Sequence, residues 1–453
     1  MAEKLLSVGL DVGTTTTQLI VSGLTVQNQA SGFAVPEMQI VRREIRYKSP
    51  VHFTPLTDES HVDGEAIRKI VEAEYEKAGI GRQDVDTGAI IITGETSRKK
   101  NAETVLSALS SLAGDFVVAT AGPDLESSLA AKGAGATEYS EKTGKFVLHM
   151  DIGGGTSNLA LVENGKILRT GCLNVGGRLL KFDNRGILQY VSPVLQGLTT
   201  LRVGQKPEPA QVEAVAQILT QGLEMAAGLR PPTELLDKLL TKEASAVWQP
   251  PEPGAVISFS GGVADCIDQK HPDRAFGDMG PALGQAIKKS LLCRGSYILG
   301  QETIRATVIG AGCHSAQLSG STVFHRGVQL PVKNLPVAAL DGELSPARIR
   351  QKIAEKDADR VVLAMQGEAA PTYERVTVLA RILAEATGGK GVYVCLESDM
   401  AKALGHSLSL LLPPDAPILC IDRVRLQPES FLDIGAPVGP ALPVVIKTLI
   451  LSQ

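Results

Sequence analysis

Residues 10–19 read LDVGTTTTQL and residues 150–159 read MDIGGGTSNL, and the two stretches align without a gap. Asp, Gly, Thr and Leu are identical at four matched positions, and the pairs Val/Ile, Thr/Ser and Gln/Asn are close substitutions. An apolar, strand-like run lies on each side of each turn, over 5–10 and 18–22 and again over 146–150 and 158–162. The sequence therefore predicts an internal duplication of one strand–turn–strand hairpin.

The composition of these two turns favours phosphate binding. Gly and small Thr residues let backbone N–H groups approach an anion closely, and successive N–H groups form a nest for phosphate. The Asp at the end of each first strand would repel phosphate, so its expected use is to hold Mg²⁺, commonly through water. Either turn alone could be a tight turn with a purely structural role, but the matched pair predicts two hairpins that hold a triphosphate from both sides.

A third element follows at residues 256–264, which read VISFSGGVA. This pattern is typical of a buried strand that ends in two glycines before a helix. Paired glycines at that point would let a purine or ribose lie against the backbone. Gly-Gly after a strand is also a common structural turn, so this signal gains weight only beside the two hairpins.

The rest of the chain alternates strands with helices, which predicts an α/β protein. A length of 453 residues corresponds to about three domains at roughly 150 residues each. Beyond residue 300 we expect a third, Rossmann-like region. The expected strands are 39–47, 89–93, 115–119, 166–170, 255–259, 307–309, 360–364, 391–395 and 417–421, and the expected helices are 66–77 with Asp63 as its cap, 101–112, 211–228 and 374–386.

Composition excludes several classes of function. The formal net charge is −4, and the longest Lys/Arg run is only Arg98-Lys99-Lys100, so no nucleic-acid footprint is indicated. Apolar stretches end well short of about 18 residues, which argues against a membrane span, and the start of the chain lacks a secretory pattern. The six cysteines are scattered without a CxxC pair, which indicates reduced thiols in a cytoplasmic protein and no zinc or iron–sulfur site.

The two hairpins and the later strand–Gly-Gly resemble the phosphate-1, phosphate-2 and adenosine motifs of the actin/Hsp70/sugar-kinase ATPase superfamily. That resemblance implies an actin-like ATPase fold of two α/β lobes around a nucleotide cleft, plus a C-terminal α/β region. It implies interdomain helices near 121–130 and 277–287. The expected division is 1–145 as the first lobe with an insertion at about 23–88, 146–297 as the second lobe with the adenosine motif and returning helix, and 298–453 as a C-terminal domain of unknown role.

A closer resemblance covers almost the whole chain. The stretches at 10–21, 91–95 with 100–102, 116–126, 149–161 and 307–322 resemble the ethanolamine ammonia-lyase reactivating factors. Members of that family use ATP and Mg²⁺ to release damaged cobalamin from a suicidally inactivated lyase, so that fresh adenosylcobalamin can enter. The resemblance implies ATP and ADP as ligands, ethanolamine ammonia-lyase as partner, and a cytoplasmic location, either free or associated with a bacterial microcompartment.

The resemblance also assigns candidate site residues. Asp11 and Asp151 correspond to the metal-site carboxylates, and Asp124 and Glu126 compete for the role of orienting the attacking water. The register does not decide between those two. The remaining residues would hold the nucleotide: Gly13, Thr14 and Thr15 in the first turn, Gly153, Gly154, Gly155 and Thr156 in the second, and Gly261 and Gly262 at the adenosine.

Other signals are weaker. Residues 59–64 (ESHVDG) resemble the DxHxxG cobalamin motif with Glu in place of Asp, but a polar loop explains them better, so we assign the adenosylcobalamin to the partner enzyme. Residues 308–322 are read as a structural Gly/Ser-rich turn, and His149, on the same strand face as Asp151, as core packing or support and not as a catalytic base. A small-molecule kinase of the same fold and a non-catalytic actin-like filament protein remain alternatives. The oligomeric state is left open, with a homodimer among the options.

Overall fold

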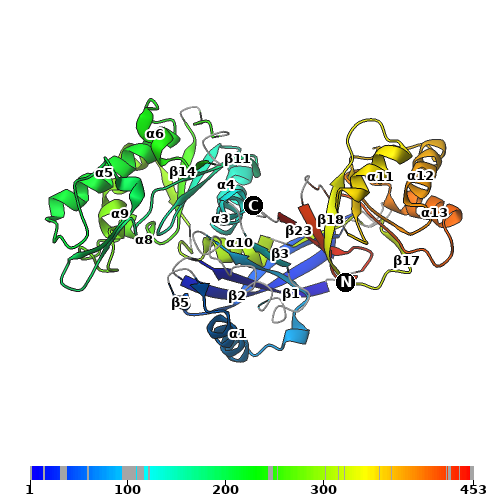
Figure 1. Ribbon diagram of the computed structural model, residues 1–453, viewed down its shortest axis with the longest axis horizontal. Helices are drawn as coiled ribbons and strands as arrows, with labels where there is room; N and C mark the ends of the chain where they lie inside the picture. Colours follow the sequence, from blue (N-terminus) through cyan, green and yellow to red (C-terminus); the bar gives the residue numbers. More distant parts are fainter. Residues whose placement is uncertain are drawn as a thin grey trace.

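The computed structural model describes residues 3–13, 16–30, 38–58, 61–93, 109, 117–120, 123–242, 248–251, 254–300, 302–314, 316–320, 322–356, 358–368, 370–424, 426, 430–437 and 439–448. Its three large sheets form three bodies that lie side by side (Figure 1). The blue N-terminal body lies in the middle, the green body to the left, and the yellow-to-red C-terminal body to the right.

The first lobe is built on a sheet with the order β3-β2-β1-β7-β8. The central strand β1 runs antiparallel to β2 and parallel to β7. Asp63 caps helix α1 as predicted, because its carboxylate accepts the Ala66 N–H at 3.0 Å. The elements are β1 (Glu3–Val12), β2 (Thr16–Asn28), β3 (Met38–Lys48), β4 (His52–Phe53), β5 (Leu56–Asp58), β6 (His61–Val62), α1 (Gly64–Ala78), the 3₁₀ turn η1 (Arg82–Asp84), β7 (Thr87–Ile92) and β8 (Val117–Thr120).

Residues 23–88 were expected as an insertion, and this expectation is wrong for most of them. They complete β2, supply the third strand β3, and supply α1, whose Ile67, Val71 and Tyr75 enter the core of the lobe. The predicted helix at 101–112 lies outside the described residues, apart from position 109.

The second lobe repeats this topology with the order β11-β10-β9-β14-β15. In both lobes the first strand lies in the middle of the sheet. The second and third strands lie on one side of it, and each pairs antiparallel with its neighbour. The two later strands lie on the other side, and the nearer one runs parallel to the central strand. The predicted duplication therefore extends from one hairpin to a whole sheet. The elements are β9 (Val147–Ile152), β10 (Ser157–Glu163), β11 (Lys166–Leu173), β12 (Leu180–Phe182), β13 (Leu188–Val191), η3 (Pro193–Leu195), α5 (Pro209–Ala226), α6 (Glu234–Leu239), β14 (Val256–Ser260), α8 (Asp265–Asp268), α9 (Gly280–Lys288), η4 (Leu291–Cys293) and β15 (Tyr297–Leu299).

Two helices join the lobes. Helix α3 (Pro123–Gly133) follows the first sheet, packs against β11 and β10, and is followed by α4 (Ala136–Thr143). Helix α10 (Ala306–His314) follows the second sheet and packs back against α3, β1 and β2 of the first lobe (Figure 1). Gly133 and Gly310 allow this crossing, because an added Cβ would lie only 1.8 Å from the Ala306 carbonyl oxygen and 2.1 Å from the Leu129 carbonyl oxygen, respectively.

Helix α10 corrects three sequence expectations. Residues 307–309 were predicted as a strand, and 308–322 as a turn between strands, but residues 306–314 are helical. The returning helix was expected near 277–287, but α9 packs on α5 and α8 within the second lobe, so α10 is the helix that returns.

The C-terminal module is an eight-stranded sheet with the order β16-β23-β22-β18-β19-β20-β21-β17. Strands β18 to β21 are parallel, and helices α11, α12 and α13 share one core with alternate strand residues, which confirms the predicted Rossmann-like region. The elements are β16 (Ala316–Leu318), β17 (Phe324–Arg326), β18 (Val332–Ala339), α11 (Pro346–Ala354), β19 (Val362–Met365), α12 (Tyr373–Thr387), β20 (Val392–Leu396), α13 (Ala401–Leu411), β21 (Ile418–Ile421), β22 (Ser430–Ile434) and β23 (Pro443–Thr448).

Candidate functional site

The two matched turns have the same backbone geometry. The Gly13 N–H donates to the Thr16 carbonyl at 2.9 Å, and the Gly153 N–H donates to the Thr156 carbonyl at 2.9 Å. The register is also the same, because Asp11 lies opposite Gln18 and Asp151 lies opposite Asn158. Thr14 and Thr15 lie outside the described residues. The two turns therefore match in hydrogen bonding and strand register as well as in sequence.

The second turn is held so that its amides face one way. The carbonyls of Gly153 and Gly154 accept the N–H groups of Gly177 and Arg178 at 3.0 and 2.7 Å. Because a trans peptide directs its N–H opposite to its C=O, the N–H groups of Gly154 and Gly155 point away from residues 177–178. Neighbouring amides that point the same way are what an anion-binding nest requires.

The two strand-end aspartates are both held by hydroxyl groups. Thr93 donates to the half-buried Asp11 at 2.9 Å. Asp151 is 7% exposed and accepts a hydrogen bond from Ser260 of β14, and Thr307 of α10 lies near enough to lower its pKa. Burial raises the pKa of Asp11 to about 7 and that of Asp151 to about 6, and the charge of Asp151 adds to the rise at Asp11. The two carboxylates, one from each lobe, therefore interact electrostatically.

The donor set fits Mg²⁺ bound together with phosphates. Mg²⁺ prefers oxygen ligands and usually keeps several waters while it binds one or two carboxylates and substrate phosphates. A divalent cation between the two carboxylates would relieve the repulsion that adds to the rise in the pKa of Asp11. Among the described residues, no group of three or more His, Cys, Asp or Glu side chains could form a metal cage. The site thus offers what Mg²⁺–triphosphate needs, and a cage for a protein-bound metal is not present in these residues.

The two glycines after β14, Gly261 and Gly262, have different surroundings. Gly261 has a φ of +86°, and an added Cβ would lie 2.4 Å from the carbonyl oxygen of Ile152, directly beside the second turn. Gly262 has open space, since its Cβ would meet only the Ile304 side chain at 4.0 Å. Gly261 therefore allows close packing of β14 against the turn, and Gly262 is the more accessible of the two.

The two acidic candidates lie in the first turn of α3. Asp124 is exposed, and it accepts a hydrogen bond from Thr170 of β11 at 2.5 Å, which links α3 to the second lobe. Glu126 is half-buried, and one turn further along the helix Ala130 is fully buried. The role of either residue toward water stays a prediction.

Sequence reasoning missed the side chains that support the site. Thr93 follows β7, which is parallel to β1, so the pairing of those two strands could have pointed to it. Ser260 sits inside the adenosine motif but was not singled out, and Thr307 was hidden by the wrong strand assignment. Arg178 packs against Gly154 and pairs with Asp278 at 3.5 Å, and no motif in the sequence signals that contact.

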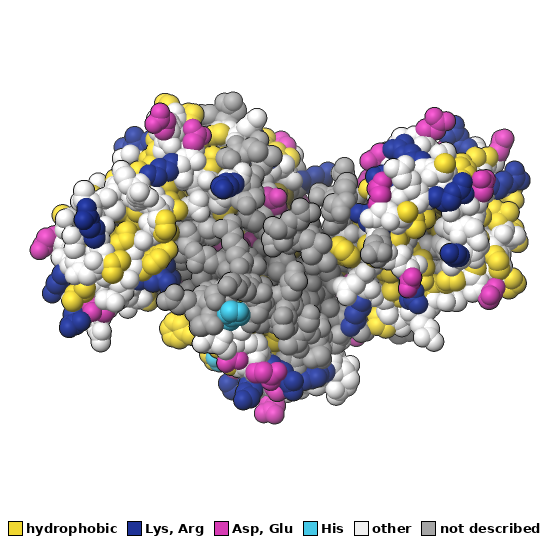
Figure 2. Space-filling model, viewed as in Figure 1, with side chains coloured by type: hydrophobic (Ala, Val, Ile, Leu, Met, Phe, Trp, Pro, Cys, Tyr) yellow, Lys and Arg dark blue, Asp and Glu magenta, His cyan; other side chains and the backbone are white. Residues whose placement is uncertain are grey.

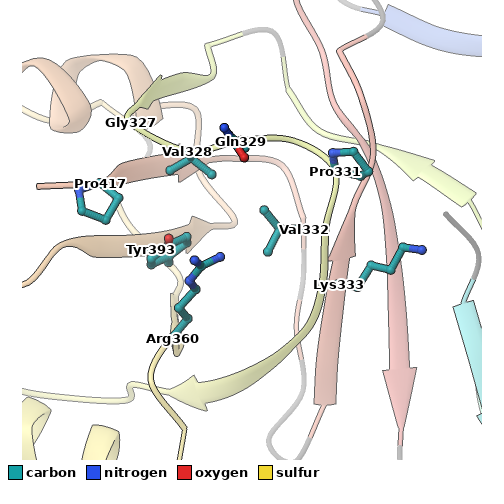
Figure 3. A pocket seen from close by; sticks show the side chains of 9 residues that line it. All are labelled: Gly327, Val328, Gln329, Pro331, Val332, Lys333, Arg360, Tyr393 and Pro417. Atoms are coloured by element: carbon teal, nitrogen blue, oxygen red, sulfur yellow. The ribbon is translucent and has the colours of Figure 1, made fainter. Parts of the chain in front are cut away.

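Two cavities among the described residues lie away from the matched turns. A cavity of about 650 Å³ opens in the C-terminal module at the amino ends of β19 to β21 (Figure 3). Its lining residues are Gly327, Val328, Gln329, Pro331, Val332, Lys333, Arg360, Tyr393 and Pro417. A second, of about 250 Å³, lies at the carboxyl ends of the parallel strands and includes Asp341, Gln366 and Glu397. Neither cavity touches the two turns.

Figure 2 shows Lys and Arg side chains interspersed with Asp and Glu over the visible parts of the second lobe and the C-terminal module. No helix among the described residues is long and apolar enough to cross a membrane.

Comparison with known proteins places these features in context. The family described as "Ethanolamine utilisation protein EutA" matches residues 3–452. Proteins of Salmonella typhimurium and Escherichia coli, each described as "Ethanolamine ammonia-lyase reactivase EutA", are both 38% identical to this chain, with 98% of each chain covered.

Solved structures match more distantly. A Ppx/GppA family member of Aquifex aeolicus has a TM-score of 0.42 at 14% identity and covers 68% of this chain and 97% of its own. Component A of the (R)-2-hydroxyglutaryl-CoA dehydratase of Acidaminococcus fermentans has a TM-score of 0.34 at 15% identity and covers 68% and 96%, respectively.

Proposed function

Because the chain belongs to the ethanolamine utilisation protein EutA family, we propose that it is an ATP-dependent reactivase of ethanolamine ammonia-lyase. In this role it releases damaged cobalamin from the inactivated lyase, so that adenosylcobalamin can bind again. The observation that carries the ATP-dependent part is the pair of matched turns, one on each lobe, each preceded by a strand-end aspartate with a raised pKa.

The proposed site residues act as follows. Asp11 and Asp151 hold Mg²⁺ through water, and the bound ion neutralises charge on the phosphates. The amides of the two turns hold the phosphates. Asp124 or Glu126 orients the attacking water. The remaining nucleotide contacts are Gly13, Thr14, Thr15, Gly153, Gly154, Gly155 and Thr156 at the phosphates, and Gly261 and Gly262 at the adenosine.

The two crossing helices, α3 and α10, transmit a change in the bound nucleotide to the partner. Thr307 at the start of α10 lies near Asp151 and lowers its pKa, and the same helix packs on α3 and β1 of the other lobe. Gln18, which lies opposite Asp11, donates to the carbonyl of Ile304 at 3.2 Å. A change in how the carboxylates hold the ion therefore moves the same segment that sets the angle between the lobes, and this couples nucleotide to partner affinity.

Several finer assignments belong to the same proposal. The adenosylcobalamin is the cofactor of the lyase and not of this chain. The first lobe comprises residues 1–145, the second begins at 146, and the C-terminal module follows α10, so the boundary moves from 297 to about 315. The protein acts in the cytoplasm, free or at a bacterial microcompartment, as a monomer or a homodimer.

We expect the affinity for the lyase to differ at least tenfold between the ADP and ATP states, which corresponds to about 1.4 kcal/mol of coupling. The measurement is a calorimetric titration of inactivated lyase with this protein in saturating ADP–Mg²⁺ and then in a non-hydrolysable ATP analogue with Mg²⁺. Indistinguishable affinities contradict the coupling. Formation of ADP that requires a small phosphoryl acceptor and no lyase would instead identify a kinase.

A further inference from the structure

A chain of buried hydrogen bonds ends on Asp151. The Ser258 hydroxyl lies 3.0 Å from His149 Nδ1, and His149 Nε2 lies 2.9 Å from the Ser260 hydroxyl. Ser260 in turn donates to Asp151 Oδ1. Ser258, His149 and Ser260 are all fully buried. Four polar side chains are thus connected in a row inside the second lobe.

Strand pairing explains how the row forms. Strands β9 and β14 are parallel, and their register places His149 beside Ser258 and Asp151 beside Ser260. Residues two apart on a strand share a face, so all four side chains lie on one side of the sheet. The alternate residues Leu148, Met150, Ile257 and Phe259 belong to the apolar core on the other side.

The protons in this row can be assigned from chemistry. Each ring nitrogen of His149 faces a serine hydroxyl, and a neutral imidazole has one N–H and one acceptor nitrogen. The single proton of the Ser260 hydroxyl goes to Asp151, so its oxygen accepts the N–H of His149 Nε2. His149 Nδ1 then accepts from Ser258. Donation runs in one direction, from Ser258 to the carboxylate.

Among its described residues, the first lobe has no equivalent of this row. The residue that aligns with His149 is Gly9, where an added Cβ would lie 2.5 Å from the carbonyl oxygen of Val308 in α10. The backbone of the crossing helix occupies the space that a histidine would need. Asp11 is held instead by Thr93 of the neighbouring strand end. A histidine at this point is therefore specific to the second hairpin and is not a requirement of the duplicated fold.

We infer that His149 is a positioning residue for the nucleotide-bound metal: through Ser260 it fixes the orientation of the Asp151 carboxylate. An apolar side chain would fill the same core position without the cost of burying a polar ring, so the complete hydrogen bonding of His149 points to this role. This inference rests on the proposed function of Asp151 as a metal-site carboxylate. Support of a ligand by a hydrogen-bonded neighbour typically changes metal affinity by 10–100-fold.

The test compares His149→Leu, which removes both hydrogen bonds, with His149→Gln, whose amide can accept from Ser258 and donate to Ser260. Calorimetry gives the ATP affinity at a series of Mg²⁺ concentrations and with excess EDTA. We expect His149→Leu to raise about tenfold the Mg²⁺ concentration at which Mg²⁺ has half of its effect on ATP affinity. The ATP affinity measured in excess EDTA and the unfolding midpoint should stay within error of the parent protein. His149→Gln should stay within about twofold.

Ser260→Ala removes a single hydroxyl, and it is the variant to test if His149→Leu fails to fold. It should reproduce the higher Mg²⁺ requirement. A folded Ser260→Ala or His149→Leu protein with an unchanged Mg²⁺ requirement overturns the inference, and so does an equal loss in the Leu and Gln variants. If the parent protein itself shows no Mg²⁺-dependent ATP binding, the proposed function is overturned and this inference with it.

Discussion

Asp11→Asn and Asp151→Asn are each expected to lower Mg²⁺-dependent ATP turnover at least about 100-fold, equivalent to about 2.7 kcal/mol of barrier height. Each change removes a charge that the metal needs and leaves the side-chain volume unchanged. The measurement is steady-state ADP release at saturating ATP and Mg²⁺. Asp433→Asn is the matched control, because Asp433 begins the same Asp-Ile-Gly triplet as Asp151 but is buried in β22 of the C-terminal module.

The same two variants are expected to gain stability in the absence of nucleotide. Burial raises the pKa of Asp11 to about 7 and of Asp151 to about 6, so the ionised carboxylates destabilise the fold at pH 8. The Asn variants should then unfold a few degrees above the parent protein. The difference should shrink as the pH falls below the folded pKa values and vanish only below the ordinary carboxyl pKa of 3.8, where the groups are protonated in both the folded and the unfolded states. Turnover within about twofold of the parent for both variants would refute the assignment of these carboxylates.

Gly310→Ala is expected to separate the two crossing helices. The new Cβ would lie 2.1 Å from the Leu129 carbonyl oxygen, and a backbone atom in a packed helix cannot move aside cheaply. We expect a loss of about 3 kcal/mol or more in the free energy of unfolding. ATP turnover should also fall, because the displaced helix carries Thr307, which lies near Asp151 and lowers its pKa.

Gly295→Ala is the control for that change, since no atom lies within 4 Å of its added Cβ and its φ is not positive. Differential scanning calorimetry of both variants gives the comparison. Equal unfolding midpoints for Gly310→Ala and Gly295→Ala would show that the contact between α3 and α10 is not tight.

The hairpins could be predicted because short-range chemistry decides them. Gly, Thr and a strand-end Asp determine the turn wherever it occurs, and the repeat at 10–19 and 150–159 reveals two copies. The alternation of apolar residues gave β3, α1, α5 and the Rossmann-like region for the same reason.

The local sequence pattern does not predict helix α10. Its sequence, ATVIGAGCH, is rich in β-branched residues and glycine, which favour a strand or a turn. The helix forms because its glycines let it pack closely on α3 and β1, a tertiary effect that overrides local preference. The polar row at Asp151 was equally hidden, because Ser260 is 109 residues away in sequence and is brought near only by the parallel pairing of β9 and β14.

The central claim is that this chain uses ATP to restore an inactivated lyase, and a reactivation assay tests it most directly. Ethanolamine ammonia-lyase that has been inactivated with its damaged cofactor in place is mixed with this protein, ATP, Mg²⁺ and free adenosylcobalamin, and ethanolamine turnover is followed. We predict recovery of lyase activity with ATP, and none with the Asp151→Asn variant or without nucleotide. Recovery that is equal with and without ATP, or no recovery in the complete mixture, would contradict the account.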